Sequence, residues 1–241
     1  MQLPFTTEQF LGVFRLYNLV VWPAQLLLYA LAFAAVALAL RGGAHGGRVA
    51  AGILAFLWLW SGGAYHLEFF AAISPAAYLF GALFVVEGVL LIRLGVVGHR
   101  RLTFAPRRDA HGAAGALLVL YALAGYPLLG YLLGHRWPAT PTFGVPCPTT
   151  IFTLGLLLWA ARPVPRALLA IPLLWAIVGS VAALRLGMTE DYGLTVAAVV
   201  VALLALAGQR PESTRRRAFA SASSRPHMMS QSEKTSSPAS P

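Results

Sequence analysis

Long apolar runs dominate this chain and leave few folds open to it. Two of them, Leu19–Leu40 and Ala76–Val97, each contain 22 residues. A helix rises about 1.5 Å per residue, so each run is long enough to cross the roughly 30 Å of hydrocarbon in a bilayer. Because lipid offers no hydrogen-bond partner to the backbone, we expect helices in all such runs.

The composition agrees with a membrane setting. Hydrophobic residues make up 58% of the 241 residues, charged residues make up 11%, and the mean hydropathy is +0.70. A soluble domain of this length could not bury so much apolar surface. The sequence therefore predicts an all-α fold, a polytopic membrane helix bundle.

The net charge of +10 does not indicate a nucleic-acid-binding protein. The basic residues lie in short clusters between the apolar runs and in the segment 209–241. Clusters of this kind report the orientation of membrane spans. We therefore do not expect nucleic acid as a partner. The expected partners are the lipid bilayer and a small-molecule or ion substrate.

Hydropathy divides the chain into three parts. Residues 1–18 contain a capping box, Thr6-x-x-Gln9, and apolar residues at helical spacing, which is typical of an amphipathic helix at the membrane surface. Residues 209–241 are rich in Ser, Pro and Arg, and we expect a disordered cytoplasmic tail that attracts anionic lipid. Between them lies a membrane domain, 19–208, with seven predicted spans: 19–40, 49–66, 76–97, 113–133, 149–161, 167–186 and 193–208.

The distribution of basic residues supports seven spans. With seven crossings, fourteen Arg and Lys residues fall on one side and three on the other, and Arg93 lies within a span. The positive-inside rule then places the N-terminus outside and the C-terminus in the cytoplasm. Omitting the short span 149–161 would move the basic tail outside and remove the asymmetry.

Three blocks of sequence carry a resemblance to a known family. They are Leu3–Phe10 (LPFTTEQF), Tyr17–Gln25 (YNLVVWPAQ) and Thr142–Gly155 (TFGVPCPTTIFTLG). With these blocks the chain resembles a family of uncharacterised bacterial multi-pass membrane proteins, some of which are loosely labelled permeases. The resemblance extends to about residue 208 and implies a protein of the bacterial inner membrane. It implies no established activity and no functional residues.

Two better-understood architectures also have seven helices with the N-terminus outside. A microbial rhodopsin needs a lysine in its last helix for the retinal Schiff base, and residues 193–208 contain no lysine. We therefore expect no retinal, and no other cofactor is indicated. A small sugar transporter built from two parallel repeats remains open.

The segment Pro146-Cys-Pro-Thr-Thr150 contains the only cysteine of the chain. If Pro148 begins the helix, Cys147 occupies the N-cap, where the helix dipole favours a reactive thiolate. Thr149 and Thr153 then share one helix face, with Thr150 beside them. Alternatively, the prolines shape a re-entrant turn, Cys147 is a small buried apolar group, and the threonines hydrogen-bond to their own helix.

Glu87 lies near the middle of the predicted span 76–97. A carboxylate at that depth is costly unless it is neutralised or partnered, so it should face the interior of the bundle. It is either a proton carrier or cation site, or a protonated group that bonds between helices.

Metal-ligating residue types gather at the predicted outer ends of the spans. A site formed by His66, Glu68 and Cys147 would suit a metal or thiol chemistry, although no spacing matches a known zinc or copper motif. The alternative is a set of solvated polar residues. The whole group comprises His66, Glu68, His135, Cys147, Glu190 and Asp191.

No phosphate-binding glycine loop, nucleophile elbow or acidic catalytic pair is present, so we expect no enzyme and no catalytic residues. The favoured hypothesis is a small-solute or ion permease. Glu87 would couple a proton or cation, Thr149, Thr150 and Thr153 would line the path, and Cys147 would lie at its outer mouth. The alternatives are a metal-handling or thiol-redox membrane protein, and a non-transporting assembly or sensor subunit.

Overall fold

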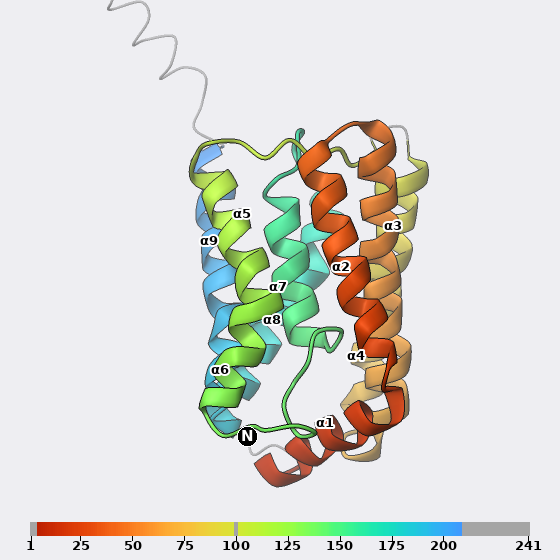
Figure 1. The fold of residues 1–241 in the computed structure, drawn as a ribbon, viewed down its shortest axis with the longest axis vertical. Helices are drawn as coiled ribbons and strands as arrows, with labels where there is room; N and C mark the ends of the chain where they lie inside the picture. Colours follow the sequence, from red (N-terminus) through yellow and green to blue (C-terminus); the bar gives the residue numbers. More distant parts are fainter. Residues whose placement is uncertain (1–3, 99–100, 209–241) are drawn as a thin grey trace, which may run out of the picture. The chain divides into compact units, whose positions relative to one another are not determined.

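The computed structural model describes residues 4–98 and 101–208, and in these ranges the chain is helical, with two isolated β-bridges and no β-strand. It divides into two units, Met1–Leu204 and Ala205–Pro241, and the helix bundle belongs to the first (Figure 1). The all-α prediction is confirmed. The predicted disordered tail, 209–241, lies outside the described residues.

The first helix, α1 (Thr7–Val21), begins with the predicted capping box. The Thr6 hydroxyl accepts a hydrogen bond from the Gln9 N–H at 3.2 Å, and the Gln9 side chain accepts one from the Thr6 N–H at 2.9 Å. The helix lies across one end of the bundle (Figure 1). It ends three residues later than predicted, because Pro23 holds the preceding residue, Trp22, in an extended conformation.

Five helical stretches are long and apolar enough to cross a membrane, judged by length and composition. The stretch Ala76–Val97 has the predicted bounds, and Ala167–Leu186 does as well. Several stretches join an α-helix to π- or 3₁₀-helical turns. In chain order they are α2 (Ala24–Arg41); α3 (Ala44–Trp60) with η1 (Ser61–Phe69) and η2 (Phe70–Ala72); α4 (Ala76–Leu90) with η3 (Leu91–Val97); α5 (Ala110–Leu120) with η4 (Tyr121–Gly125) and α6 (Tyr126–Leu132); and α8 (Ala167–Leu186).

The other two predicted spans are shorter helices, so the count of seven is not met by this criterion. They are α7 (Pro146–Leu157), with 12 residues, and α9 (Tyr192–Gly208), with 17. A third short element, the 3₁₀ turn η5 (Thr189–Asp191), precedes α9.

The second predicted span extends six residues past its expected end at His66. Its helix widens into the π-helix η1 at Ser61, where the sequence continues with Gly62 and Gly63. A Cβ atom on Gly62 would lie 3.0 Å from the carbonyl oxygen of Gly81 on α4, so the two helices approach closely here. Turns of the π type are frequent at functional sites.

The core of the bundle is formed around α7, all of whose residues are buried. It packs against α5, α8 and α3. An irregular segment, residues 133–145, enters the bundle from the end at which α1 lies and leads into α7 (Figure 1). Ser61 fixes the tip of this segment by donating a hydrogen bond to the carbonyl oxygen of Gly144 at 2.9 Å. Because the segment reaches inside the protein, α7 begins there and is short.

The two ends of the bundle differ in charge. At one end the Ala105 N–H donates a hydrogen bond to the Trp159 carbonyl at 2.8 Å, and Leu102 packs against Gly47. These contacts gather three basic segments, 41–48, 101–108 and 159–166. At the opposite end lie α1, the segment 133–145 and the acidic turn η5.

Candidate functional site

A pocket of about 370 Å³ lies at the end of the bundle covered by α1. We call it the aromatic pocket. Its walls come from α1, η1, η2, α4, α7 and α8, and its polar groups come from η1, the turn before α4, α7, α8 and η5. The lining includes the rings of Phe5, Phe10, Phe14, Tyr65, Phe70, Phe80 and Trp175 and the polar side chains of His66, Ser74, Cys147 and Asp191.

His66 is fully buried in the wall of this pocket. Its ring lies 4.8 Å from that of Phe84 and 5.0 Å from that of Trp175, measured between centroids. Neither nitrogen of the His66 ring has a hydrogen-bond partner among the described residues. Nε1 of Trp175 makes no regular hydrogen bond there either, but it lies beside the thiol of Cys147. The pocket thus contains buried polar nitrogens, those of His66, whose hydrogen-bonding capacity is unused.

Cys147 lines the aromatic pocket as the second residue of α7. The prediction that it occupies the N-cap is wrong, because Pro146 takes the first helical position, which suits proline, and Val145 is the cap. The thiol lies beside the carboxylate of Asp191.

Asp191, in the turn η5, is only 3% exposed. It accepts a hydrogen bond from the hydroxyl of Tyr126. Burial raises the pKa of Asp191 to about 6, although the hydrogen bonds from Tyr126 and Cys147 act in the opposite direction. This carboxyl group can therefore change charge near neutral pH.

Glu190 forms a separate pair beside the aromatic pocket. Its carboxylate is fully buried, and one oxygen lies 2.7 Å from Nδ1 of His135. The hydroxyl of Tyr121 donates a hydrogen bond to the Glu190 carbonyl oxygen at 2.6 Å. Of the predicted group of outer polar residues, His66, Cys147 and Asp191 therefore lie in the aromatic pocket, His135 and Glu190 form this pair, and Glu68 belongs to neither.

The structure does not bring together the three residues considered for a metal. Glu68 is exposed, whereas His66 and Cys147 are buried. Residues two apart on a helix do not face the same side, which explains why Glu68 points away from His66. Across the described ranges, no three His, Cys, Asp or Glu side chains are grouped so that they could hold a metal ion.

The three threonines of α7 are fully buried and do not line the aromatic pocket. Thr150 donates a hydrogen bond to the Pro146 carbonyl at 2.9 Å, and Thr153 donates to the Thr149 carbonyl at 2.8 Å. Thr153 also accepts a hydrogen bond from Nε1 of Trp58 at 3.0 Å. For Thr150 and Thr153, these contacts match the alternative in which the threonines bond back to their own helix, whereas the hydroxyl of Thr149 has no partner among the described residues.

Glu87 is fully buried on α4, as expected for a carboxyl group facing the bundle interior. Neither of its carboxyl oxygens has a hydrogen-bond partner among the described residues, and it does not line the aromatic pocket. Phe80 lines the pocket seven residues earlier, so Glu87 lies on the same helix face about 10 Å further along α4. Phe84 lies between these two residues in the sequence and contacts both His66 and Trp175.

Sequence reasoning missed the role of Asn18. Its amide donates hydrogen bonds of 2.7 Å to the carbonyls of Pro138 and Thr140, and it accepts one from the Thr142 hydroxyl at 2.9 Å. The sequence contained a signal, because Asn18 is the only asparagine of the chain and lies beside a long apolar run. The sequence did not show that Asn18 lies next to the segment 133–145.

The fold and the site define an all-helical protein with helices compatible with membrane spans and an aromatic pocket at one end. A family model described as a family of unknown function (DUF6064) matches residues 7–216, and the chain belongs to that family. The expected resemblance to an uncharacterised family is confirmed. No curated protein and no solved structure matches the chain.

Proposed function

We propose that this protein is a small-solute permease of the bacterial inner membrane and that its solute binds in the aromatic pocket. The observation that supports this most directly is the pair of unpartnered His66 nitrogens, beside the N–H of Trp175, in a pocket of about 370 Å³. Ligand sites are typically apolar cavities of this size with a few convergent polar groups. A buried polar group without a partner costs about 1 to 3 kcal/mol, and a bound solute can supply that partner.

The lining indicates the chemistry of the solute. Aromatic rings suit a flat or apolar body, while Trp175 donates a hydrogen bond and Asp191 accepts one. The proposed solute is a small aromatic or apolar molecule with one or two polar groups. No enzymatic step, cofactor or nucleic acid forms part of the proposal.

Glu87 keeps its proposed role as the coupling carboxyl group. It shares a face of α4 with Phe80 and Phe84, so a solute that displaces the Phe84 ring would approach Glu87 from the pocket. Thr150 and Thr153 are not part of this path, because their hydroxyls bond to their own helix. Thr149, whose hydroxyl has no partner in the described part of the chain, lies one helical turn from Thr153.

The proposal includes seven crossings, with the N-terminus outside and the C-terminus in the cytoplasm. The segment 133–145 together with α7 extends from the α1 end to the basic end, where Trp159 bonds to Ala105. The 17 residues of α9 are near the lower limit for a membrane span. The concentration of basic residues at one end supports this orientation.

Binding and uptake assays test the proposal. Purified protein is screened by thermal shift with small aromatic solutes such as indole and 4-hydroxybenzoate, and a hit is followed by uptake into proteoliposomes. Trp175→Phe keeps an aromatic side chain but removes the N–H and replaces the indole by a smaller ring, so it should weaken binding about tenfold. Trp22→Phe, at an exposed tryptophan, is the matched control. Glu87→Gln should preserve binding and remove the dependence of uptake on a proton gradient.

A second candidate is a non-transporting sensor or assembly subunit. It is favoured by the separation of Glu87 from the aromatic pocket, since Glu87 does not contribute to the pocket lining. Saturable binding without uptake would support this candidate, and absence of binding across the panel would contradict both. The metal-handling alternative has no comparable support, because its three residues do not converge.

A further inference from the structure

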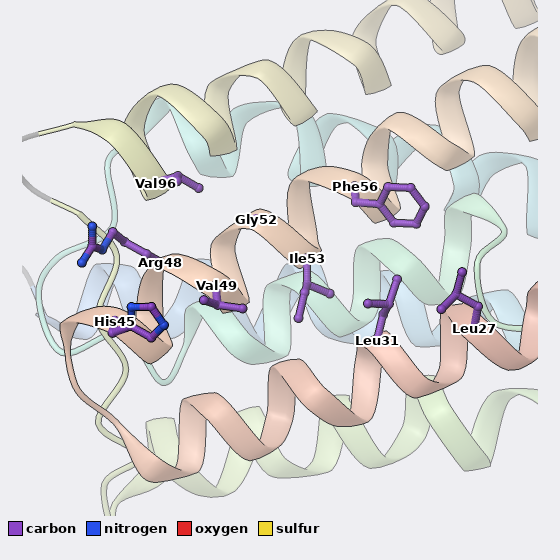
Figure 2. A pocket seen from close by; sticks show the side chains of 9 residues that line it. All are labelled: Leu27, Leu31, His45, Arg48, Val49, Gly52, Ile53, Phe56 and Val96. Atoms are coloured by element: carbon purple, nitrogen blue, oxygen red, sulfur yellow. The ribbon is translucent and has the colours of Figure 1, made fainter.

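A second cavity, unrelated to the proposed solute site, is an open groove of about 690 Å³ on the outside of the bundle. We call it the α2–α3 groove. Its apolar walls are formed by α2, α3 and η3, and the side chains of Leu27, Leu31, Val49, Ile53, Phe56 and Val96 line it (Figure 2).

Two basic side chains, His45 and Arg48, lie at one end of the groove (Figure 2). Nε of Arg48 is buried and has no hydrogen-bond partner among the described residues. The ion pairs within the same residues involve other side chains. The groove therefore ends in positive charge that no carboxylate of the described chain neutralises.

The backbone adds to this positive charge. Both basic residues lie in the first turns of α3, whose N-cap, Gly43, makes no side-chain capping hydrogen bond. The free N–H groups and the helix dipole at such an end attract anions. Together with Arg48 they make this end of the groove complementary to a phosphate group.

The length of the groove fits one lipid chain. Phe56 lies eleven residues after His45, which corresponds to about 16 Å along α3. This is close to half of the roughly 30 Å hydrocarbon thickness of a bilayer, the depth of one leaflet. Gly52 keeps the middle of the groove open, since a Cβ atom there would meet only Val96, at 4.0 Å.

We propose that the α2–α3 groove binds one anionic phospholipid, with an acyl chain along the apolar wall and the headgroup phosphate at Arg48 and His45. A net negative headgroup is favoured over a zwitterionic one because both side chains at this end are basic. Basic pockets between membrane helices recognise anionic headgroups in this way. A free phosphate would use only the basic end and leave the apolar wall without a function.

The test is lipid binding to the full-length protein in detergent, counted by native mass spectrometry during titration with phosphatidylglycerol. One phosphatidylglycerol molecule should bind to each protein more tightly than any further ones. Arg48→Gln should weaken that copy about fivefold. Gly52→Leu, which fills the groove without changing its charge, should also weaken it. The matched controls are Arg166→Gln, at an exposed arginine, and Gly63→Leu, where an added Cβ meets nothing within 4 Å.

Two further arms distinguish the possible sources of the phosphate. Phosphatidylcholine should bind more weakly than phosphatidylglycerol, and the soluble headgroup glycerophosphoglycerol should not displace the bound lipid at equal concentration. Unchanged affinity in both Arg48→Gln and Gly52→Leu would overturn the proposal. Equal binding of phosphatidylglycerol and phosphatidylcholine would also overturn the proposal, since that result indicates only non-selective boundary lipid.

Discussion

Asp191 is the residue whose charge state most directly links the aromatic pocket to pH. Burial raises its pKa from 3.8 to about 6. Between these values the folded state binds more protons than the unfolded state, so folding stability falls as pH rises. The stabilisation of the folded state that comes from protonated Asp191 is fully present below a pH of about 4 and is lost as pH rises through about 6.

Asp191→Asn removes this titration while keeping an acceptor for Tyr126. We predict that, as pH rises from 4 to 7, the stability of the variant increases relative to that of the wild type by up to about 3 kcal/mol. Thermal unfolding of both proteins in detergent at the two pH values measures the difference. If the stability difference between the variant and the wild type were the same at pH 4 and at pH 7, Asp191 would not titrate in this range.

Asn18 anchors the irregular segment that precedes α7. In Asn18→Ala the part-buried carbonyls of Pro138 and Thr140 lose their donor, and an unpaired group that is fully buried costs about 1 to 3 kcal/mol. We predict a loss of unfolding free energy of about 2 to 4 kcal/mol, measured by thermal or denaturant unfolding in detergent. Thr195→Ala, which removes an exposed hydroxyl bonded to Ser180, should change stability by less than about 1 kcal/mol. Equal effects of the two variants would contradict the anchoring role.

At the scale of elements, α5 and α7 approach closely at two glycines. A Cβ atom on Gly155 would lie 3.0 Å from the carbonyl oxygen of Gly115, and one on Gly115 would lie 2.7 Å from that of Gly155. Small residues at a membrane helix interface allow this distance. A side chain added at either glycine would therefore push α5 and α7 apart.

Gly155→Ala is therefore expected to destabilise the protein by about 1 to 3 kcal/mol, the usual cost of overpacking. The control is Gly12→Ala on the exposed face of α1, where an added Cβ meets nothing within 4 Å and should be neutral or slightly stabilising. Melting temperatures of both variants provide the comparison. Similar melting temperatures for the two would show that the α5–α7 contact is not tight.

The elements were predictable where local sequence determines them. Apolar length located the helices, and the capping box located the start of α1 at Thr7. The π-helix η1 was not predicted, because no local sequence signal marks its wider turns, and the close approach of its Gly62 to α4 is a tertiary contact. The start of α7 was missed for a similar reason, since the inward path of residues 133–145 is held by Asn18 and Ser61.

The candidate site was predictable in part. Residue type selected His66, Cys147 and Asp191, which the fold brings to one pocket. It also selected Glu68, which points outward, because residue type does not specify the helix face. Trp175 was not selected, since a tryptophan in an apolar span is unremarkable until its N–H is seen without a regular hydrogen bond.

At the scale of the whole molecule, the proposed orientation depends on residues 133–157 completing one crossing. The α-helical part of this stretch, α7, has only 12 residues, or about 18 Å. The irregular segment before it must supply the remaining depth, and such backbone is tolerated within a membrane only when protein surrounds it. Its burial around Phe143 and Gly144 meets that condition.

Labelling with a membrane-impermeant maleimide tests this crossing on a Cys147→Ser background. Arg136→Cys and Ala161→Cys place exposed thiols before and after the stretch. Since the proposed crossing separates them, we predict that Arg136→Cys is labelled in intact cells and that Ala161→Cys is labelled only after the membrane is opened. Labelling of both from the same side would place residues 133–157 in a loop that enters and leaves by one face. The C-terminus would then lie outside, against the concentration of basic residues in the tail.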